Sequence, residues 1–203
     1  MTYTPVLPIP DIDDPIRTRQ PFPPLPRSPE ETADAVARWT DPLTFLVEHW
    51  IGEPVRMRVT ARRHHEITAA ESAVLHVPEG TPAWYRLGSM VPASWWDGAN
   101  VLPVALTGLL LLPCRLPAAV VEALDDGDPL GRILARAGRE AGMPVSRVHH
   151  GDKVTPATEH ATATAETSAL IYLGAALVAL TWEKFMPWLW DPGMSRHVPP
   201  PAT

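Results

Sequence analysis

Two charged residues lie inside apolar segments of the 203-residue chain and are the strongest candidates for chemistry. Arg86 lies in the segment Trp84–Met90, and Glu183 directly follows the apolar run 176–182. A guanidinium can bind a carboxylate through two parallel hydrogen bonds. Burial raises the pKa of a carboxyl group and makes it a usable acid near neutral pH. Either side chain would be inert if its strand turned it toward solvent, so both alternatives stay open at this point.

The other polar groups point less clearly to a site. The run Arg62–Glu66 contains adjacent histidines, which point in different directions and make a poor chelating pair, so we expect a solvated loop and no metal site. Cys114 has no positioned base near it in the sequence, so we expect an inert buried thiol. The sequence has no local motif for phosphate binding, for a serine hydrolase or for a zinc site.

Tryptophan is frequent, with eight residues, and six of them gather in or near the segments that carry Arg86 and Glu183. Such a cluster forms either a bulky core or an aromatic wall around a flat or apolar ligand. The six are Trp84, Trp95, Trp96, Trp182, Trp188 and Trp190.

The elements that must position these residues follow the order helices, strands, helices, strands. Because no βα units alternate, this order predicts an α+β fold with an antiparallel sheet and helices packed on one side. Capping residues and prolines begin the helices, and apolar alternation marks the strands. The polar segment 145–159 is predicted to be a loop. We expect helices at 28–39, 41–50, 117–124 and 128–140, a weak one at 69–75, and strands at 55–60, 83–91, 101–113, 164–172 and 176–185.

The length fits one domain, which we place at residues 28–192. Nine prolines fall between Pro5 and Pro29, and Pro199–Pro201 lies near the end of the chain. Proline fixes φ and removes a backbone donor, so we expect an extended N-terminal arm at 1–27 and a tail at 193–203.

The net charge and the cysteine content limit which partners and which cellular compartment are expected. A net charge of −6 provides no basic field for nucleic acid or anionic lipid, so neither is expected as a partner. One cysteine permits no intrachain disulfide, which fits a reducing, cytoplasmic setting. No signal peptide and no apolar stretch of about 20 residues is seen, so no membrane partner is expected.

Several segments, in order along the chain, resemble the chorismate lyase family. They are Leu43–Thr60, Trp84-Tyr85-Arg86, Leu109–Pro113 followed by Arg115–Val121, Asp128–Gly131, and Leu180–Pro187. Actinobacterial members that form 4-hydroxybenzoate are the most similar. Each motif is weak alone, and their common order across Leu43–Pro187 carries the resemblance.

The resemblance implies a cofactor-independent carbon–oxygen lyase with helices around a ligand cavity. Arg86 would bind the ring carboxylate of chorismate, and Glu183 would act in proton transfer. Backbone amides near Leu130 and Gly131 would help to close the site. Pyruvate would leave, and 4-hydroxybenzoate or a related aromatic acid would form.

One departure from the family weakens chorismate as the ligand. The family usually carries arginines before the penultimate strand, and the segment Ala165–Tyr172 has none. A dianion requires two cationic anchors. We therefore expect Arg62, Arg63 or Arg132 to supply the second anchor, and Trp84 and Trp182 to line the pocket.

Two alternatives remain. The first is an enzyme of secondary metabolism on the same fold, a cyclase or tailoring enzyme, acting on a more apolar substrate. The second is a non-catalytic effector-binding domain, as found in transcription regulators that share this fold. Such domains normally follow a helix-turn-helix domain, and the proline-rich arm leaves no room for one, so we rank this alternative last.

Overall fold

Six antiparallel strands form one sheet in the order β1-β2-β3-β6-β5-β4. The computed structural model describes residues 19–96, 102–124, 127–151, 165–186 and 189. The predicted α+β class with an antiparallel sheet is confirmed. The strands are β1 (Val55–Glu66), β2 (Pro82–Pro92), β3 (Ala105–Leu111), β4 (Val145–His150), β5 (Ala165–Leu173) and β6 (Ala176–Phe185). The helices are α1 (Pro29–Arg38), α2 (Leu43–Ile51), α3 (Ala69–Leu75), α4 (Ala118–Ala123) and α5 (Leu130–Ala141), with short 3-10 turns at Ala93–Trp95 and Pro113–Arg115.

The helix boundaries follow from local chemistry. Ser28 caps α1 by accepting a hydrogen bond from the backbone N–H of Glu31, and Pro29 occupies the first turn. Gly52 ends α2 with a φ of 76°, a conformation that favours glycine. Thr68 and Glu71 form a capping box at α3, which gives this seven-residue helix a definite start.

The polar segment that starts at Val145 was predicted to be a loop, and this was wrong for its first six residues. They form β4, an edge strand that pairs with β5 from Val145↔Leu173 to His150↔Ser168. Val145 and Arg147 face the core, and Arg147 is buried. An arginine at an inward position hides the apolar alternation by which a strand is recognised. Gly151 follows β4 with a φ of 86°, and residues 152–159 of the predicted loop lie outside the described residues.

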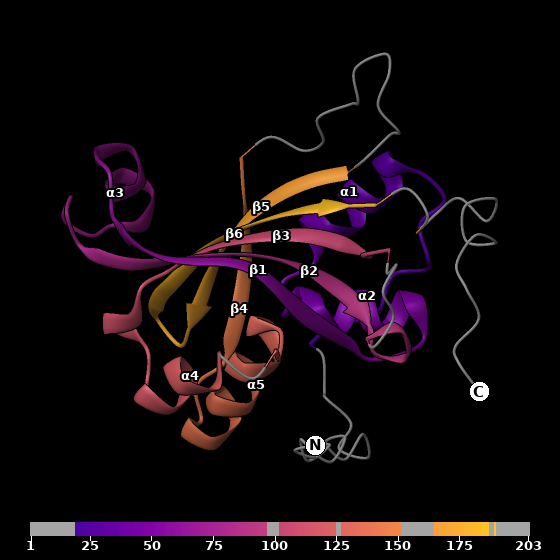
Figure 1. The fold of residues 1–203 in the computed structure, drawn as a ribbon. Coiled ribbons are helices and arrows are strands. Elements are labelled where there is room, and N and C mark those ends of the chain that lie inside the picture. Colours follow the sequence, from indigo (N-terminus) through magenta and orange to yellow (C-terminus); the bar gives the residue numbers. More distant parts are fainter. Residues whose placement is uncertain (1–18, 97–101, 125–126, 152–164, 187–188, 190–203) are drawn as a thin grey trace, which may run out of the picture.

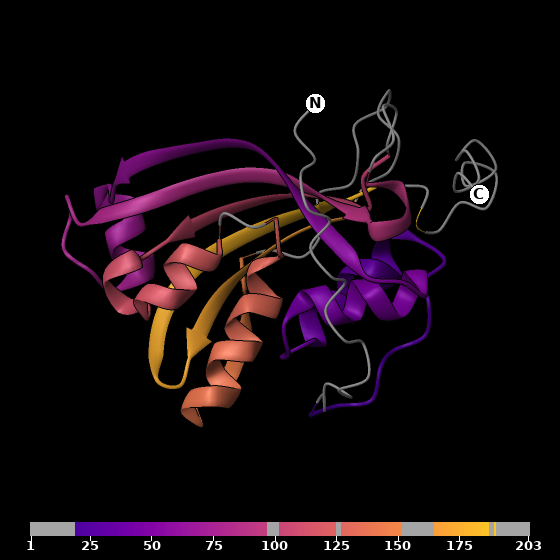
Figure 2. The same cartoon turned by 60° about the horizontal axis from the view of Figure 1, so that its bottom comes forward.

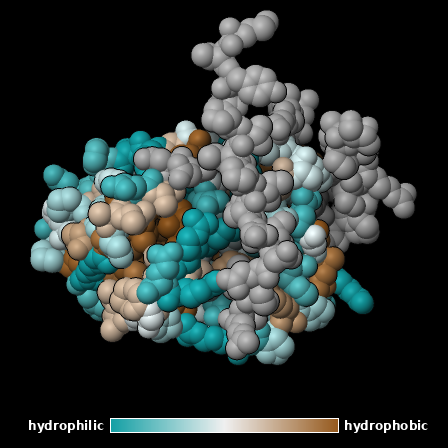
Figure 3. Space-filling view, turned by 90° about the horizontal axis from the view of Figure 1, so that it is seen from below, coloured by the Kyte–Doolittle hydropathy of each residue, from teal (hydrophilic) through white to brown (hydrophobic). Residues whose placement is uncertain are grey.

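Helices cover the two faces of the sheet unequally (Figures 1 and 2). We call the face that carries α1, α2, α4 and α5 the inner face and the one that carries α3 the outer face. Two buried apolar clusters lie between the inner face and its helices, and a third lies under α3. Figure 3 views the molecule from the side of α4 and α5, where hydrophobic areas are small and lie between hydrophilic ones in the coloured part.

Residues 19–27 pack along the helices of the inner face. The indole Nε1 of Trp50 donates to the carbonyl oxygen of Pro23 at 3.2 Å. Phe22 stacks on both Trp39 and His49, with ring centroids 5.1 and 4.3 Å away. The domain limits of 28–192 remain a prediction, because most of the arm and the whole tail lie outside the described residues. Within the described part of the chain, no helix is both long and apolar enough to cross a bilayer.

Candidate functional site

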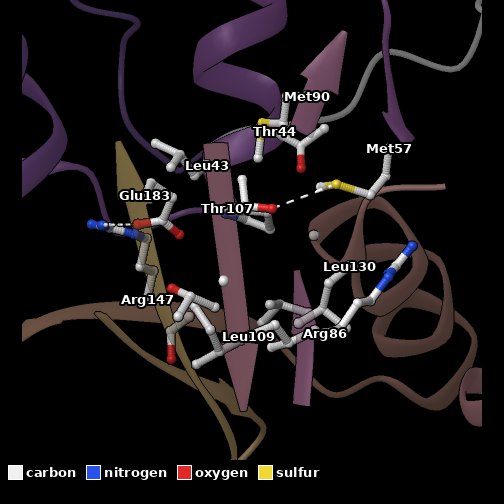
Figure 4. Close-up of a pocket in the computed structure, with 17 residues that line it drawn as sticks. Leu43, Thr44, Met57, Arg86, Met90, Thr107, Leu109, Leu130, Arg147 and Glu183 are labelled. Atoms are coloured by element: carbon white, nitrogen blue, oxygen red, sulfur yellow. Dashed lines mark hydrogen bonds and ion pairs between the residues drawn. The ribbon is translucent and has the colours of Figure 1, made fainter. Parts of the chain in front are cut away.

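A cavity lies between the inner face of the sheet and the first turns of α2 and α5 (Figure 4). Its walls are mostly apolar and include Leu43, Met57, Met90 and Leu109. Of the described residues that line it, only Arg86, Arg147 and Glu183 are charged. The cavity volume is about 60 Å³, which is several times the roughly 10–15 Å³ that one water needs.

Arg86 is the free cation of this cavity. Strand alternation places it on the inner face of β2, where only 5% of its surface is exposed. Its Nε and Nη2 atoms are buried and have no hydrogen-bond partner among the described residues. Burial, and to a lesser extent the charge of Arg62, lowers the pKa of Arg86 to about 10. An unpaired buried charge is costly, so its persistence points to an anionic ligand.

Glu183 faces the same cavity and is paired. Its Oε2 atom lies 3.5 Å from Nη2 of Arg147, whose side chain is 1% exposed. Arg147 also donates to the carbonyl oxygen of Val36 at 2.8 Å and to Oγ1 of Thr167 at 3.1 Å. Burial raises the pKa of Glu183, and the charge of Arg147 opposes that rise only in part. Sequence reasoning missed Arg147, and the apolar residues at 145 and 148 around it were the only signal of a strand there.

Arg86 and Glu183 lie on opposite sides of β3. Arg86 pairs with Leu109 of β3, which pairs with Thr181 of β6, two residues before Glu183. Two strand spacings, roughly 10 Å, therefore separate them across the sheet. Figure 4 shows the Glu183–Arg147 pair on one side of Thr107 and Arg86 on the other. Among the described residues, Arg86 is thus an unpaired cation at one end of the cavity, and Glu183 and Arg147 form a neutralised ion pair at the other.

Two helix starts converge on the cavity. The N-cap residues of α2 and α5 are prolines, and neither helix has a side-chain cap hydrogen bond. Leu130 and Gly131 line the cavity, as do Leu43 and Thr44 of α2. A Cβ atom on Gly131 would lie 2.8 Å from Oγ1 of Thr44, so the close approach of the two helices requires glycine there. Uncapped helix starts carry a partial positive charge, which favours an anion.

None of the three arginines expected as a second anchor lines the cavity. Arg62 pairs with Arg86 in the β1–β2 register, and its guanidinium lies 4.7 Å from the centre of the Trp84 ring. Arg63 lies over Tyr85 at 4.5 Å. Arg132 binds Glu48 and Asp128 beside the cavity.

No tryptophan among the described residues lines the cavity. Trp84 packs against the apolar cluster under α4 and α5. Trp182 lies on the outer face, because it directly precedes Glu183 and successive strand residues point to opposite faces. Its indole covers Gly108, where an added Cβ atom would lie 2.0 Å from the ring, and it lies at a tilt beside Tyr85, with ring centroids 5.5 Å apart. Trp188 and Trp190 lie outside the described residues.

The remaining candidates form no site. Cys114 is exposed, whereas the sequence suggested a buried thiol. The run Arg62–Glu66 belongs to β1 and is no loop. Within the described ranges, no three histidine, cysteine, aspartate or glutamate side chains are placed to hold a metal ion.

No family model matches the sequence, and no curated protein matches it. Solved structures do resemble the fold. PhnF from Mycobacterium smegmatis has 17% sequence identity and a TM-score of 0.52, over 73% of this chain and 64% of that one. The effector domain of PhnF has 17% identity and a TM-score of 0.49, over 70% and 86%. A GntR-family transcriptional regulator from Bacillus cereus has 11% identity and a TM-score of 0.47, over 68% and 94%. These likenesses show the fold alone.

Three further sequence-based predictions, on family, activity and partners, were wrong. Membership of the chorismate lyase family has no support, because neither a family model nor a curated protein matches, and the similar solved structures named above are described as PhnF and as a GntR-family transcriptional regulator. The same finding overturns the predicted lyase activity with its chorismate, pyruvate and 4-hydroxybenzoate. It also overturns the exclusion of nucleic acid as a partner, since the net charge describes only the surface of this chain.

Proposed function

We propose that this domain is a non-catalytic sensor that binds a small organic anion in the cavity between the sheet and helices α2 and α5. The observation that carries the proposal is Arg86, a buried guanidinium whose Nε and Nη2 atoms lack a partner among the described residues while it lines the cavity. A bound carboxylate would satisfy both nitrogens at once.

The surroundings of Arg86 favour a ligand that has one negative charge and is otherwise apolar. The walls near it are Met57, Leu109 and Leu130, which offer no hydrogen bonds from their side chains. The uncapped starts of α2 and α5 add positive potential without a second full charge. Arg147 is engaged by Glu183, so Arg86 is the one unpaired cation among the described lining residues, and it matches one anionic group.

A non-catalytic role is supported by the fold and by the state of Glu183. The fold is that of PhnF, a protein with an effector domain. Glu183 is held in an ion pair with Arg147, 3.5 Å away, and lies on the other side of β3 from Arg86, so it lies away from a group that Arg86 anchors. Recognition by Arg86 and apolar contacts requires no proton transfer.

The size of the cavity limits the ligand. An apolar cavity of roughly 150 Å³ can hold benzene, whereas the cavity here measures about 60 Å³. A ring-sized acid therefore requires Met57 and Met90 to change rotamer, which methionine does at low cost. Short aliphatic acids enter with smaller changes.

Calorimetric titration with matched probes tests the proposal. Benzoate and butyrate are the anionic probes, and benzamide is the neutral match of benzoate. We expect both anions to bind the wild-type protein and benzamide to bind at least about tenfold more weakly than benzoate. In Arg86→Met, benzoate and benzamide should bind with the same affinity. Arg136→Met changes an arginine that is half exposed on α5 and does not line the cavity, so it should bind as wild type does.

Two results would overturn the proposal. Equal affinity of wild type and Arg86→Met for benzoate would remove Arg86 as the anchor. Conversion of a bound acid into a product, followed by NMR over hours, would show an enzyme.

A further inference from the structure

Within the described part of the chain, the second half of β1 is an open edge of the sheet (Figure 2). In its first half, the backbone N–H of Val55 donates to Glu48 at 3.0 Å, and that of Met57 donates to the carbonyl oxygen of Gly127 at 2.8 Å. From Val59 to Glu66, β1 pairs with β2 on one side only, and no described element pairs with the other side. All of these residues are exposed except His65, which is partly so. A row of unpaired backbone donors and acceptors is a template for another strand.

Arginines concentrate positive charge along this strand. The strand contains four arginines and two histidines, and its one acidic residue is the last, Glu66. The whole chain has a net charge of −6, so the strand departs from the average surface. Two of these arginines, Arg62 and Arg63, lie along the open part of the strand and face opposite sides of the sheet, because successive strand residues alternate.

Aromatic rings hold these cations in place. Each guanidinium lies over a ring from β2 or from the turn after it, at a distance at which a cation is attracted to the ring face. The distances to the ring centres are 4.1 Å from Arg56 and 5.7 Å from Arg58 to Trp96, 4.7 Å from Arg62 to Trp84, and 4.5 Å from Arg63 to Tyr85. Their side chains are therefore ordered before a partner arrives, which lowers the entropy cost of binding.

We propose that this edge docks an extended, acidic peptide segment, which adds to the sheet as a seventh strand beside Val59–Glu66. The backbone row supplies affinity, and the arginines select for carboxylate side chains. A second copy of β1 does not fit, because two arginine-rich strands repel each other. Nucleic acid would contact the arginines but would leave the backbone donors and acceptors of β1 unpaired. An acidic peptide strand would satisfy both the arginines and the backbone groups.

Fluorescence anisotropy with labelled octapeptides tests the proposal on the full chain. The probe alternates glutamate with valine or threonine. One control peptide has lysine at every glutamate position. A second control keeps all charges but carries N-methyl groups on alternate backbone amides, which prevents strand pairing. We expect the acidic probe to bind, with an affinity that falls as salt rises, and each control to bind at least about tenfold more weakly.

Matched charge reversals locate the binding. Arg63→Glu should weaken the acidic probe roughly tenfold, whereas Arg38→Glu, which makes the same change at an exposed position of α1, should not. Circular dichroism checks that both variants fold. Equal binding of the N-methylated probe, tighter binding of a DNA duplex than of the peptide, or a concentration-dependent dimer that Arg63→Glu dissociates would each overturn the proposal. Failure of benzoate to bind the cavity leaves these results unaffected, because β1 from Val59 onward does not line it.

Discussion

Nη2 of Arg147 lies 3.5 Å from Oε2 of Glu183, and both side chains are almost entirely removed from solvent. The pair joins the edge strand β4 to the interior strand β6, across β5, at one end of the ligand cavity. Breaking a buried pair leaves an uncompensated charge, so we expect this contact to matter for stability as well as for the shape of the site.

Removing Arg147 should destabilise the protein. Arg147→Met leaves Glu183 buried without its cation and removes the donors to Val36 and Thr167. We expect a loss of about 3–5 kcal/mol in the free energy of unfolding, measured by urea denaturation. The double variant with Glu183→Gln should recover part of the loss. A double variant as unstable as the single one would show that the pair is unimportant.

The raised pKa of Glu183 predicts a pH dependence of stability. Its pKa in the folded protein lies above its ordinary value of 4.5. As pH rises past 4.5, the carboxyl group of Glu183 loses its proton in the unfolded chain but keeps it in the folded protein, so the unfolded chain binds fewer protons. The stabilising contribution of Glu183 to the free energy of unfolding is therefore full below about pH 4.5, and it is lost as pH rises through the pKa of Glu183 in the folded protein.

Urea denaturation from pH 4 to 8 measures this effect against a matched variant. Glu183→Gln cannot titrate, so the stability of wild type relative to this variant should fall as pH rises. A constant difference over that range would contradict a raised pKa for Glu183.

Replacing Arg86 should stabilise the empty protein while it abolishes anion binding. Arg86→Met removes a buried, unpaired cation and retains an unbranched chain of similar length. We expect a gain of about 1–3 kcal/mol in the free energy of unfolding. Thermal denaturation in ligand-free buffer measures it, and Arg136→Met serves as the control. A loss of stability would mean that Arg86 holds the fold and is not reserved for a ligand.

A methyl group at Gly131 should push the start of α5 away from α2. The added Cβ atom would lie 2.8 Å from Oγ1 of Thr44 and 2.9 Å from Cβ of Pro42. We expect Gly131→Ala to cost about 1–3 kcal/mol in the free energy of unfolding and to weaken benzoate binding. Adding Thr44→Ala relieves one of the two contacts and should restore part of both. Wild-type stability in Gly131→Ala would show that the helices separate freely.

Much of the secondary structure could be predicted because its causes are local. The cap at Ser28 and the glycine at the end of α2 act within a few residues of themselves. The strands β3 and β6 could also be predicted, because each lies in an apolar run of the sequence. The order of these elements was enough to predict an antiparallel α+β fold.

The site could be predicted only in part. Arg86 and Glu183 were recognisable as charges inside apolar strands, and the sheet register placed both on the inner face. Which cation accompanies Glu183 was not visible, because Arg147 is distant in sequence and sits in a strand that looked like a loop. The likeness to lyases concerned shared elements of the fold, and a fold can serve binding as well as catalysis.

The sequence by itself determined the helices and most strands, since these depend on neighbours along the chain, and it marked Arg86 and Glu183 as charges within apolar strands without deciding which face they occupy. Only the tertiary structure decided that Arg147 pairs with Glu183, that Trp182 points away from the cavity, and that Arg86 has no partner among the described residues. Those outcomes depend on which strands lie side by side. Strand order is set by packing between distant segments, and a polar residue is free or paired according to what that packing brings within about 3 Å.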